Sequence, residues 1–173
     1  MANVKAILKN RDGGKDIQFM FNPKELSFQN NVDTADNPGA RSERTGRPKV
    51  SFSNIPPKTI TIANILFDTF ETGKDVVDLY IKAFEEATRF INGKQRPPVY
   101  CFLWGKQYLE YCFIEQVNYK LTKFSKTGVP VRAIIDNLTL KETEKPTDDR
   151  SSSPATQANP LADNMQTRNQ LSL

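Results

Sequence analysis

Residues 98–121, PVYCFLWGKQYLEYCFIEQVNYKL, form the most apolar stretch of the chain. Gly105-Lys106 divides this stretch into two strand-like halves, and glycine at the first central position suits a type II′ turn. The pattern predicts a β-hairpin around Gly105-Lys106. Its core face takes three residues from each strand: Tyr100, Phe102, Trp104, Leu109, Tyr111 and Phe113.

The opposite face of this hairpin is also apolar. It holds Val99, Cys101, Leu103, Tyr108, Glu110, Cys112 and Ile114. A sheet face turned to water needs fewer apolar side chains than this. We therefore expect something to cover it, and the sequence leaves three covers open: a helix, a second sheet or another copy of the protein.

The only two cysteines of the chain lie in this hairpin. In the predicted register Cys101 faces Glu110 and Cys112 faces Val99, which makes the thiols diagonal neighbours about 7 to 8 Å apart. A disulfide needs Cβ atoms about 4 Å apart. We expect two reduced, half-buried cysteines, and because the sequence has no histidine and no Cys-x-x-Cys, no metal site.

Period-2 alternation predicts further strands outside this hairpin. They cover residues 4–8, 17–21, 26–28, 58–67 and 131–140. The turn Asp12-Gly13-Gly14 joins the first two, and the apolar phase of the last changes at Asp136-Asn137. Such a change is typical of a bulge or bend where a strand passes from one sheet to another. The sequence thus predicts an antiparallel β domain of about seven strands.

One helix is predicted between Lys74 and Ile91, where apolar residues recur at spacings of three and four. Thr72 is the expected N-cap, and Asn92-Gly93 the expected stop. The helix is expected to cover the sheet with its apolar face. The predicted fold class is mainly β: an antiparallel sandwich or barrel with one amphipathic helix packed on the sheet.

Residues 30–57 form a long polar stretch that several glycines and prolines interrupt. We expect a long loop without regular structure. It carries four basic residues, Arg41, Arg44, Arg47 and Lys49. Two interpretations remain open: a solvated mobile loop, or a loop whose positive charges contact an acidic partner surface.

The chain has 173 residues, a formal net charge of +4 and a pI near 9.0. This length suits one domain with a core of its own. We expect that domain in residues 1–143 and a flexible polar tail in residues 144–173, which contain no aromatic residue. No stretch is apolar enough for a leader or a membrane span, so we expect a cytoplasmic protein without membrane insertion.

The absence of histidine excludes the usual Ser-His-Asp and Cys-His nucleophile arrangements. No glycine-rich phosphate loop and no Gly-x-Ser-x-Gly elbow is present either. The sequence therefore predicts no catalytic residue, cofactor, metal or small-molecule substrate. An alternative function is a small β-barrel nucleic-acid-binding module that stacks bases on aromatic and basic side chains, although the large aromatics mostly fall on the predicted core face. Its candidate residues are Tyr108, Tyr119, Lys106, Lys120 and Lys123.

Four segments, taken in order, resemble the tube adaptor proteins of contractile injection systems and related phage tails. They are FNPKEL at 21–26, LFDTFETGKDV at 66–76, RPPVYCFLWG at 96–105, and GVPVRA at 128–133 followed by LTLKE at 138–142. The resemblance implies a non-enzymatic component with a tail-tube-like β fold. Six copies would form a ring between the spike hub and the inner tube.

The same resemblance implies partners and a place of assembly. The spike or hub protein, the inner tube protein and baseplate components would be the neighbours, in a phage-tail-like particle assembled in the cytoplasm. Adaptors of this kind commonly carry a LysM module after the tube-like domain. Residues 144–173 have neither the length nor the periodicity for one, so peptidoglycan binding is not implied. The basic residues of the 30–57 loop are expected to reach a neighbouring subunit or the adjacent ring.

Overall fold

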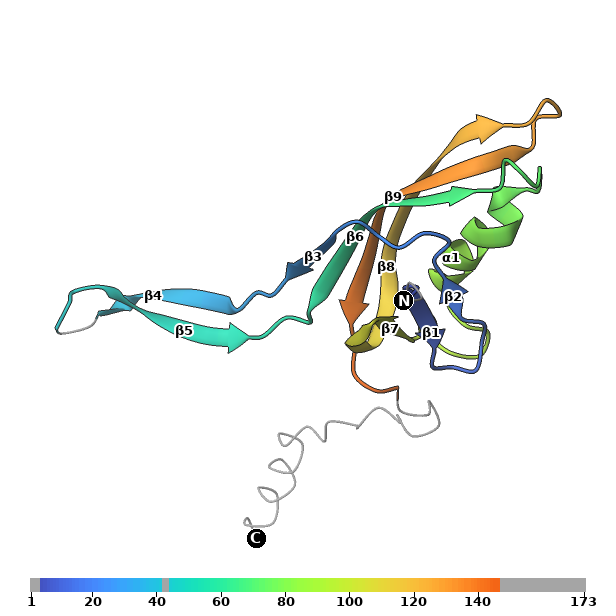
Figure 1. The fold of residues 1–173 in the computed structure, drawn as a ribbon. Coiled ribbons are helices and arrows are strands. Elements are labelled where there is room, and N and C mark those ends of the chain that lie inside the picture. The colour runs from blue at the N-terminus through green and yellow to red at the C-terminus, as the bar shows by residue number, and fades with distance from the viewer. Residues whose placement is uncertain (1–3, 42–43, 147–173) are drawn as a thin grey trace, which may run out of the picture.

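The computed structural model describes residues 4–41 and 44–146, which form a β body and a projecting two-stranded arm (Figure 1). Seven strands make one antiparallel sheet in the order β2-β1-β7-β8-β9-β6-β3. Their bounds are Ile7–Asn10 (β1), Ile17–Gln18 (β2), Leu26–Gln29 (β3), Thr59–Asp68 (β6), Tyr100–Trp104 (β7), Lys106–Phe124 (β8) and Pro130–Glu142 (β9). Each overlaps a strand predicted from the sequence, so the mainly β fold class is confirmed.

The sheet curls, so that its edges approach each other. Phe28 of edge strand β3 contacts Tyr108 of β8, with ring centroids 5.8 Å apart. Beyond the other edge, the backbone N–H of Asp68 at the end of β6 donates to the Sδ of Met20, 3.3 Å away, in the segment that follows β2. The inner face of this curled sheet forms the core with alternate residues of each strand, among them Leu8, Ile62 and Ile135.

The helical segment consists of a π turn, η1 (Val77–Ile81), and α1 (Lys82–Ala87). Phe84 is fully buried, and its ring packs edge-on against Phe19 and Phe67 at 6.0 and 5.8 Å. The helix therefore covers one face of the sheet, as the sequence predicts. Figure 1 shows it beside β2, against the body.

The predicted helix bounds of 74–91 are wrong at both ends. Asp75, and not Thr72, caps the N-terminus, because its Oδ1 accepts the N–H of Val77 at 2.8 Å. The Thr72 hydroxyl instead lies 3.1 Å from the carbonyl oxygen of Thr69. At the other end, the backbone N–H and the hydroxyl of Thr88 both donate to the carbonyl oxygen of Glu85. The helix therefore ends well before Gly93.

The β7–β8 hairpin is tighter than predicted. Trp104 pairs with Lys106, which leaves Gly105 alone at the apex with φ +72°, a conformation that favours glycine. The predicted pair Phe102 and Leu109 is present, but register shifts on both sides of it move the other pairs.

These shifts also correct the predicted faces of the hairpin. Cys112 lies opposite Tyr100 instead of Val99. Cys112 and Ile114 consequently enter the core, while Tyr111 and Phe113 are only half-buried. Both cysteines are free, as predicted, but they are fully buried and not half-buried.

The predicted phase change in β9 is present. Val131, Ala133 and Ile135 are buried, and burial then resumes at Leu138 and Leu140. Against β8, Asn137 pairs with Asn118 while Ile135 pairs with Tyr119, so Asp136 is the extra residue of a bulge. The strand nevertheless stays within one sheet.

The prediction that residues 30–57 form a loop without regular structure is wrong. They contain β4 (Asp33–Arg41) and β5 (Pro48–Asn54), which pair antiparallel. The prolines do not prevent this pairing, since Pro48 is the first residue of its strand and Pro38 lies where the register shifts between Asn37 and Arg41. In Figure 1 the pair extends away from the body.

Most of the predicted tail, residues 147–173, lies outside the described residues, so the boundary after residue 143 stays a prediction. Within the described ranges, no helix is both long and apolar enough to cross a membrane.

Candidate assembly surfaces

The arm formed by β4 and β5 is a sheet of two strands only. Its register runs from Asp33 opposite Asn54 to Arg41 opposite Pro48. Because each described strand pairs on one side, the outer edge of each offers backbone N–H and C=O groups to a further strand. The arm therefore has the geometry to add to a sheet or ribbon of another molecule.

Large apolar side chains on and beside the arm are exposed to solvent. Phe52 in β5 and Ile55 just after it are each 79% exposed, and Val32 just before β4 is 55% exposed. An arm with several such side chains is typical of a surface that a partner covers.

The predicted interface residues gather at the outer part of the arm. Arg41 ends β4 and Lys49 lies in β5, opposite Asn37. Arg44 and Arg47 are exposed in the connection between the two strands. The structure thus places the four basic residues on a hairpin instead of a loop; which surface they contact stays a prediction.

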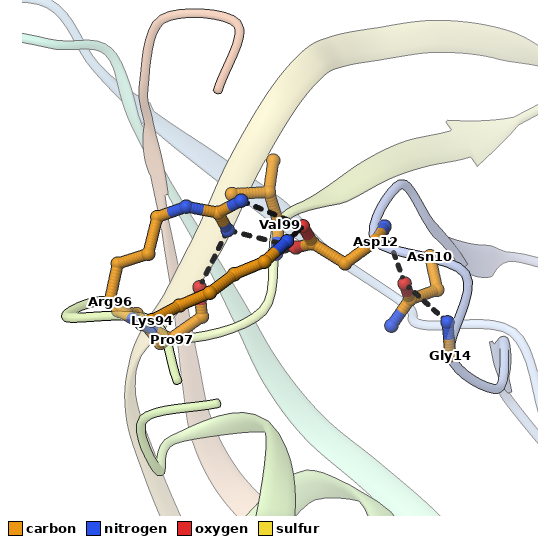
Figure 2. A network of polar contacts seen from close by, with 7 residues as sticks. All are labelled: Asn10, Asp12, Gly14, Lys94, Arg96, Pro97 and Val99. Carbon is orange, nitrogen blue, oxygen red and sulfur yellow. Dashed lines mark hydrogen bonds and ion pairs between the residues drawn. The ribbon is translucent and has the colours of Figure 1, made fainter. Parts of the chain in front are cut away.

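A network of polar contacts around Asp12 joins two loops of the body (Figure 2). Its Oδ1 accepts from Lys94 Nζ at 2.8 Å and from Arg96 Nη2 at 2.7 Å. Its Oδ2 accepts from Arg96 Nη1 at 2.9 Å and from the backbone N–H of Val99 at 2.8 Å. The Asp12 side chain is only 8% exposed, and the hydrogen bond from Arg96 is the main reason that its pKa lies well below its ordinary value.

The turn that carries Asp12 is itself ordered by a side chain. Asn10 Oδ1 accepts the backbone N–H groups of Asp12 at 2.7 Å and of Gly14 at 3.0 Å, as Figure 2 shows. This Asx-type turn points Asp12 at Arg96. Sequence analysis missed the network, because Asp12 and Arg96 are 84 residues apart and no local pattern relates them.

A pocket of about 350 Å³ lies beside this network. Its lining residues are Arg11, Asp12, Lys94, Arg96, Tyr111, Lys145 and Pro146. Arg11 lies over the Tyr111 ring, with its Cζ 5.7 Å from the centroid. Among the described residues, the pocket is thus lined by four cationic side chains and one carboxylate.

Comparison with known proteins assigns the chain to a family. The model of the family described as contractile injection system tube protein matches residues 2–151. The chain belongs to the contractile injection system tube protein family. No curated protein matches it.

Membership of this family gives the protein a structural role in a phage-tail-like particle. The matched residues include the whole curled sheet, the arm and the pocket beside Asp12. The resemblance found in the sequence is therefore confirmed at the level of the contractile injection system.

The residues considered for nucleic-acid stacking do not form one surface in this tube-family protein. Lys106 lies over the Tyr108 ring at 5.2 Å near the start of β8, and Lys123 lies over the Phe70 ring at 3.2 Å near its end. Between them the Tyr119 hydroxyl donates to Glu85 at 2.5 Å, and Lys120 pairs with Asp136 at 2.8 Å. Within the part of the chain that the structure describes, no group of three or more His, Cys, Asp or Glu residues is placed to hold a metal.

Proposed function

We propose that this protein is a non-enzymatic adaptor that joins the spike hub or baseplate to the inner tube of a contractile injection system. Six copies form a closed ring, and the arm of each copy contacts a neighbouring subunit or the adjacent ring. The family match across body and arm is the observation that carries this proposal. The order of the four sequence segments supports the adaptor position in particular.

The physical properties of the chain agree with such a role. A curled sheet with two edge strands, β2 and β3, leaves backbone groups that neighbouring copies can pair when a ring closes. The arm extends beyond the body and ends in basic residues, which suit an acidic surface on another subunit.

The direct test is purification of a tagged copy from its native host, with mass spectrometry of the bound proteins and negative-stain microscopy of the eluate. We expect sheath, tube and spike proteins together with rod-shaped particles. A lone protein, or nucleic acid whose retention falls steeply as salt rises, would contradict the proposal and favour the binding-module alternative.

A second measurement distinguishes an adaptor from a repeating tube subunit. Quantitative mass spectrometry of purified particles gives the copy number relative to the spike, and gold labelling of the tag gives the position. An adaptor is present as one ring at one end of the particle. Many copies along the whole rod would show that the chain builds the tube itself, within the same family.

A further inference from the structure

We propose that the pocket beside Asp12 binds acidic side chains of a second copy of this chain, presented by the turn that follows β6. This contact rests on the proposed assembly into repeating subunits. The pocket of one copy and the turn of the next would form a complementary pair of surfaces, and neither surface is part of the arm.

The charge balance of the pocket calls for an anion. Among the residues that the structure describes, Arg11, Lys94, Arg96 and Lys145 line it, and Asp12 is its only carboxylate. The Asp12 oxygens already accept from Lys94, from Arg96 and from one backbone N–H, so Asp12 offsets only one of the four positive charges. Arg11 and Lys145 add charge without contacting Asp12 in the described network. An oxyanion between them would meet donors that are partly fixed in advance.

The turn after β6 presents carboxylates on a rigid support. Residues 68–78, which run from the last residue of β6 through this turn to the first residues of η1, contain four acidic residues and one lysine. Asp68 pairs with Arg132, and Asp75 caps the helix. Glu71 is exposed, and so is Asp78, whose side chain is 69% exposed and lies 3.5 Å from the exposed Lys82.

Hydrogen bonds within this turn fix its shape before any partner arrives. Thr69 is buried, and its hydroxyl lies 2.6 Å from the carbonyl oxygen of Lys74. The backbone N–H groups of Thr72 and Gly73 both donate to the Thr69 carbonyl. A preformed turn loses little conformational freedom when it docks, which favours a specific contact.

One copy does not fill its own pocket with this turn. In Figure 1 the turn after β6 and the β1–β2 turn, which borders the pocket, lie on opposite sides of α1. The contact therefore joins two copies through different surfaces. Such a head-to-tail interface repeats from copy to copy and generates a ring or a stack.

Two charge-reversed variants test the contact. The pocket-reversed variant carries Arg11→Glu and Lys145→Glu, and the turn-reversed variant carries Glu71→Lys and Asp78→Lys. These four side chains are exposed, so both variants should fold, as thermal unfolding will check. Lys15→Glu with Lys24→Glu is the matched control, because it changes the same charge at exposed sites outside the pocket.

Each variant is expressed with the other particle proteins, and its incorporation into particles is measured. We expect the wild-type chain and the control to incorporate normally. Like charges facing each other should lower incorporation of either reversed variant alone by at least about tenfold. Co-expression of the two reversed variants should restore it, since the reversed pocket of one copy then matches the reversed turn of the other.

Normal incorporation of the pocket-reversed variant alone overturns the proposal, and so does a failure of co-expression to restore assembly. A second test uses purified protein without particles, so that failure of the contact can be distinguished from failure of the proposed function. Purified ¹⁴N and ¹⁵N chains are mixed and coupled with a zero-length carboxyl-to-amine reagent at low salt. A mixed-isotope peptide joining Lys145 or Lys94 to Glu71 or Asp78 supports the contact, and its absence counts against it even if particles fail to form.

Discussion

Asp12 connects the β1–β2 turn with the segment that leads into β7 through four hydrogen bonds, two of them from one guanidinium. Arg96 binds it in the bidentate geometry that fixes both groups. Without the carboxylate, two cations would face each other in a half-buried site. The residue therefore keeps two chain segments together as well as shaping one wall of the pocket.

We predict that Asp12→Asn lowers the free energy of unfolding at pH 7 by about 3 kcal/mol, because it leaves a partly buried charge without its partner. The folded-state pKa of Asp12 is lowered from its ordinary value of 3.8. Its contribution is therefore complete above about pH 5 and is lost as pH falls toward the lower folded-state pKa. Denaturant unfolding at pH 7 and pH 3 should show the difference between wild type and variant shrinking at pH 3. The exposed Glu144→Gln should show no comparable loss.

Cys112 should be chemically inert in the folded protein. Burial raises its pKa to about 12, and its Sγ lies 3.3 Å from the Tyr100 carbonyl oxygen. At pH 8 about one thiol in 10⁴ is then ionised, and the thiolate is the reactive form. Neither Cys112 nor the buried Cys101 should react with a thiol reagent at pH 8, whereas both should react in guanidinium chloride. Rapid labelling without denaturant would contradict the buried placement.

Most correct predictions of burial at single residues came from the local alternation of apolar and polar residues. In β9 it put Val131, Ala133 and Ile135 on one face, which is buried, and located a phase change at Asp136-Asn137, where the structure has a bulge. Burial in β8 was harder to predict, because a register shift between Leu109 and Cys112 exchanged the core and outer positions. Such shifts depend on pairing with other strands, which a single sequence does not contain.

At the scale of elements, the helix N-terminus gives a clear test. Asp75 Oδ1 accepts from the backbone N–H of Val77, so Asp75→Ala should destabilise the protein by about 1 kcal/mol, the usual value of an N-cap. Asp78→Ala should change stability by less than about 0.5 kcal/mol, since its pair with Lys82 is exposed. Denaturant unfolding of both variants measures the difference. Equal effects would show that Asp75 is not the cap.

The arm was the element that sequence analysis misjudged. The strands of the body can be predicted from the sequence because they have a buried face. In Thr59–Asp68, for example, every second residue is apolar through much of the strand. Strands β4 and β5 pair only with each other in the described structure and lie away from the core. Their sequences show no strong alternation, and Pro38, Gly39 and Pro48 indicate a loop.

Because the arm adds nothing to the core, its removal should leave the body folded. None of the buried core side chains that the structure describes comes from residues 33–54. Gln29 of β3 pairs directly with Thr59 of β6, so an Asn-Gly turn can replace residues 31–57. We predict a cooperative thermal transition within about 5 °C of wild type, equivalent to roughly 1 kcal/mol. Loss of cooperative unfolding would show that the arm is part of the core.

At the scale of the whole molecule, the body holds the buried core, whereas the arm carries exposed apolar and basic side chains. The curled sheet and its covering helix bury their apolar faces within one chain. The arm keeps Phe52 and Ile55 exposed and ends in basic residues. Exposed apolar side chains lower solubility and do not stabilise this fold. We therefore expect a partner to cover them once the protein is part of the particle.

The arm charges should therefore matter for assembly and not for folding. We predict that reversal of Arg41, Arg44, Arg47 and Lys49 to Glu leaves the thermal unfolding midpoint unchanged but lowers incorporation into particles by at least about tenfold, because like charges then face the acidic partner surface. Incorporation is measured by quantitative mass spectrometry of purified particles. Reversal of four exposed lysines elsewhere, Lys9, Lys15, Lys24 and Lys126, makes the same change in net charge and should incorporate normally. If the arm variant enters complete particles at the control level, its basic tip does not contact the neighbouring subunit or ring.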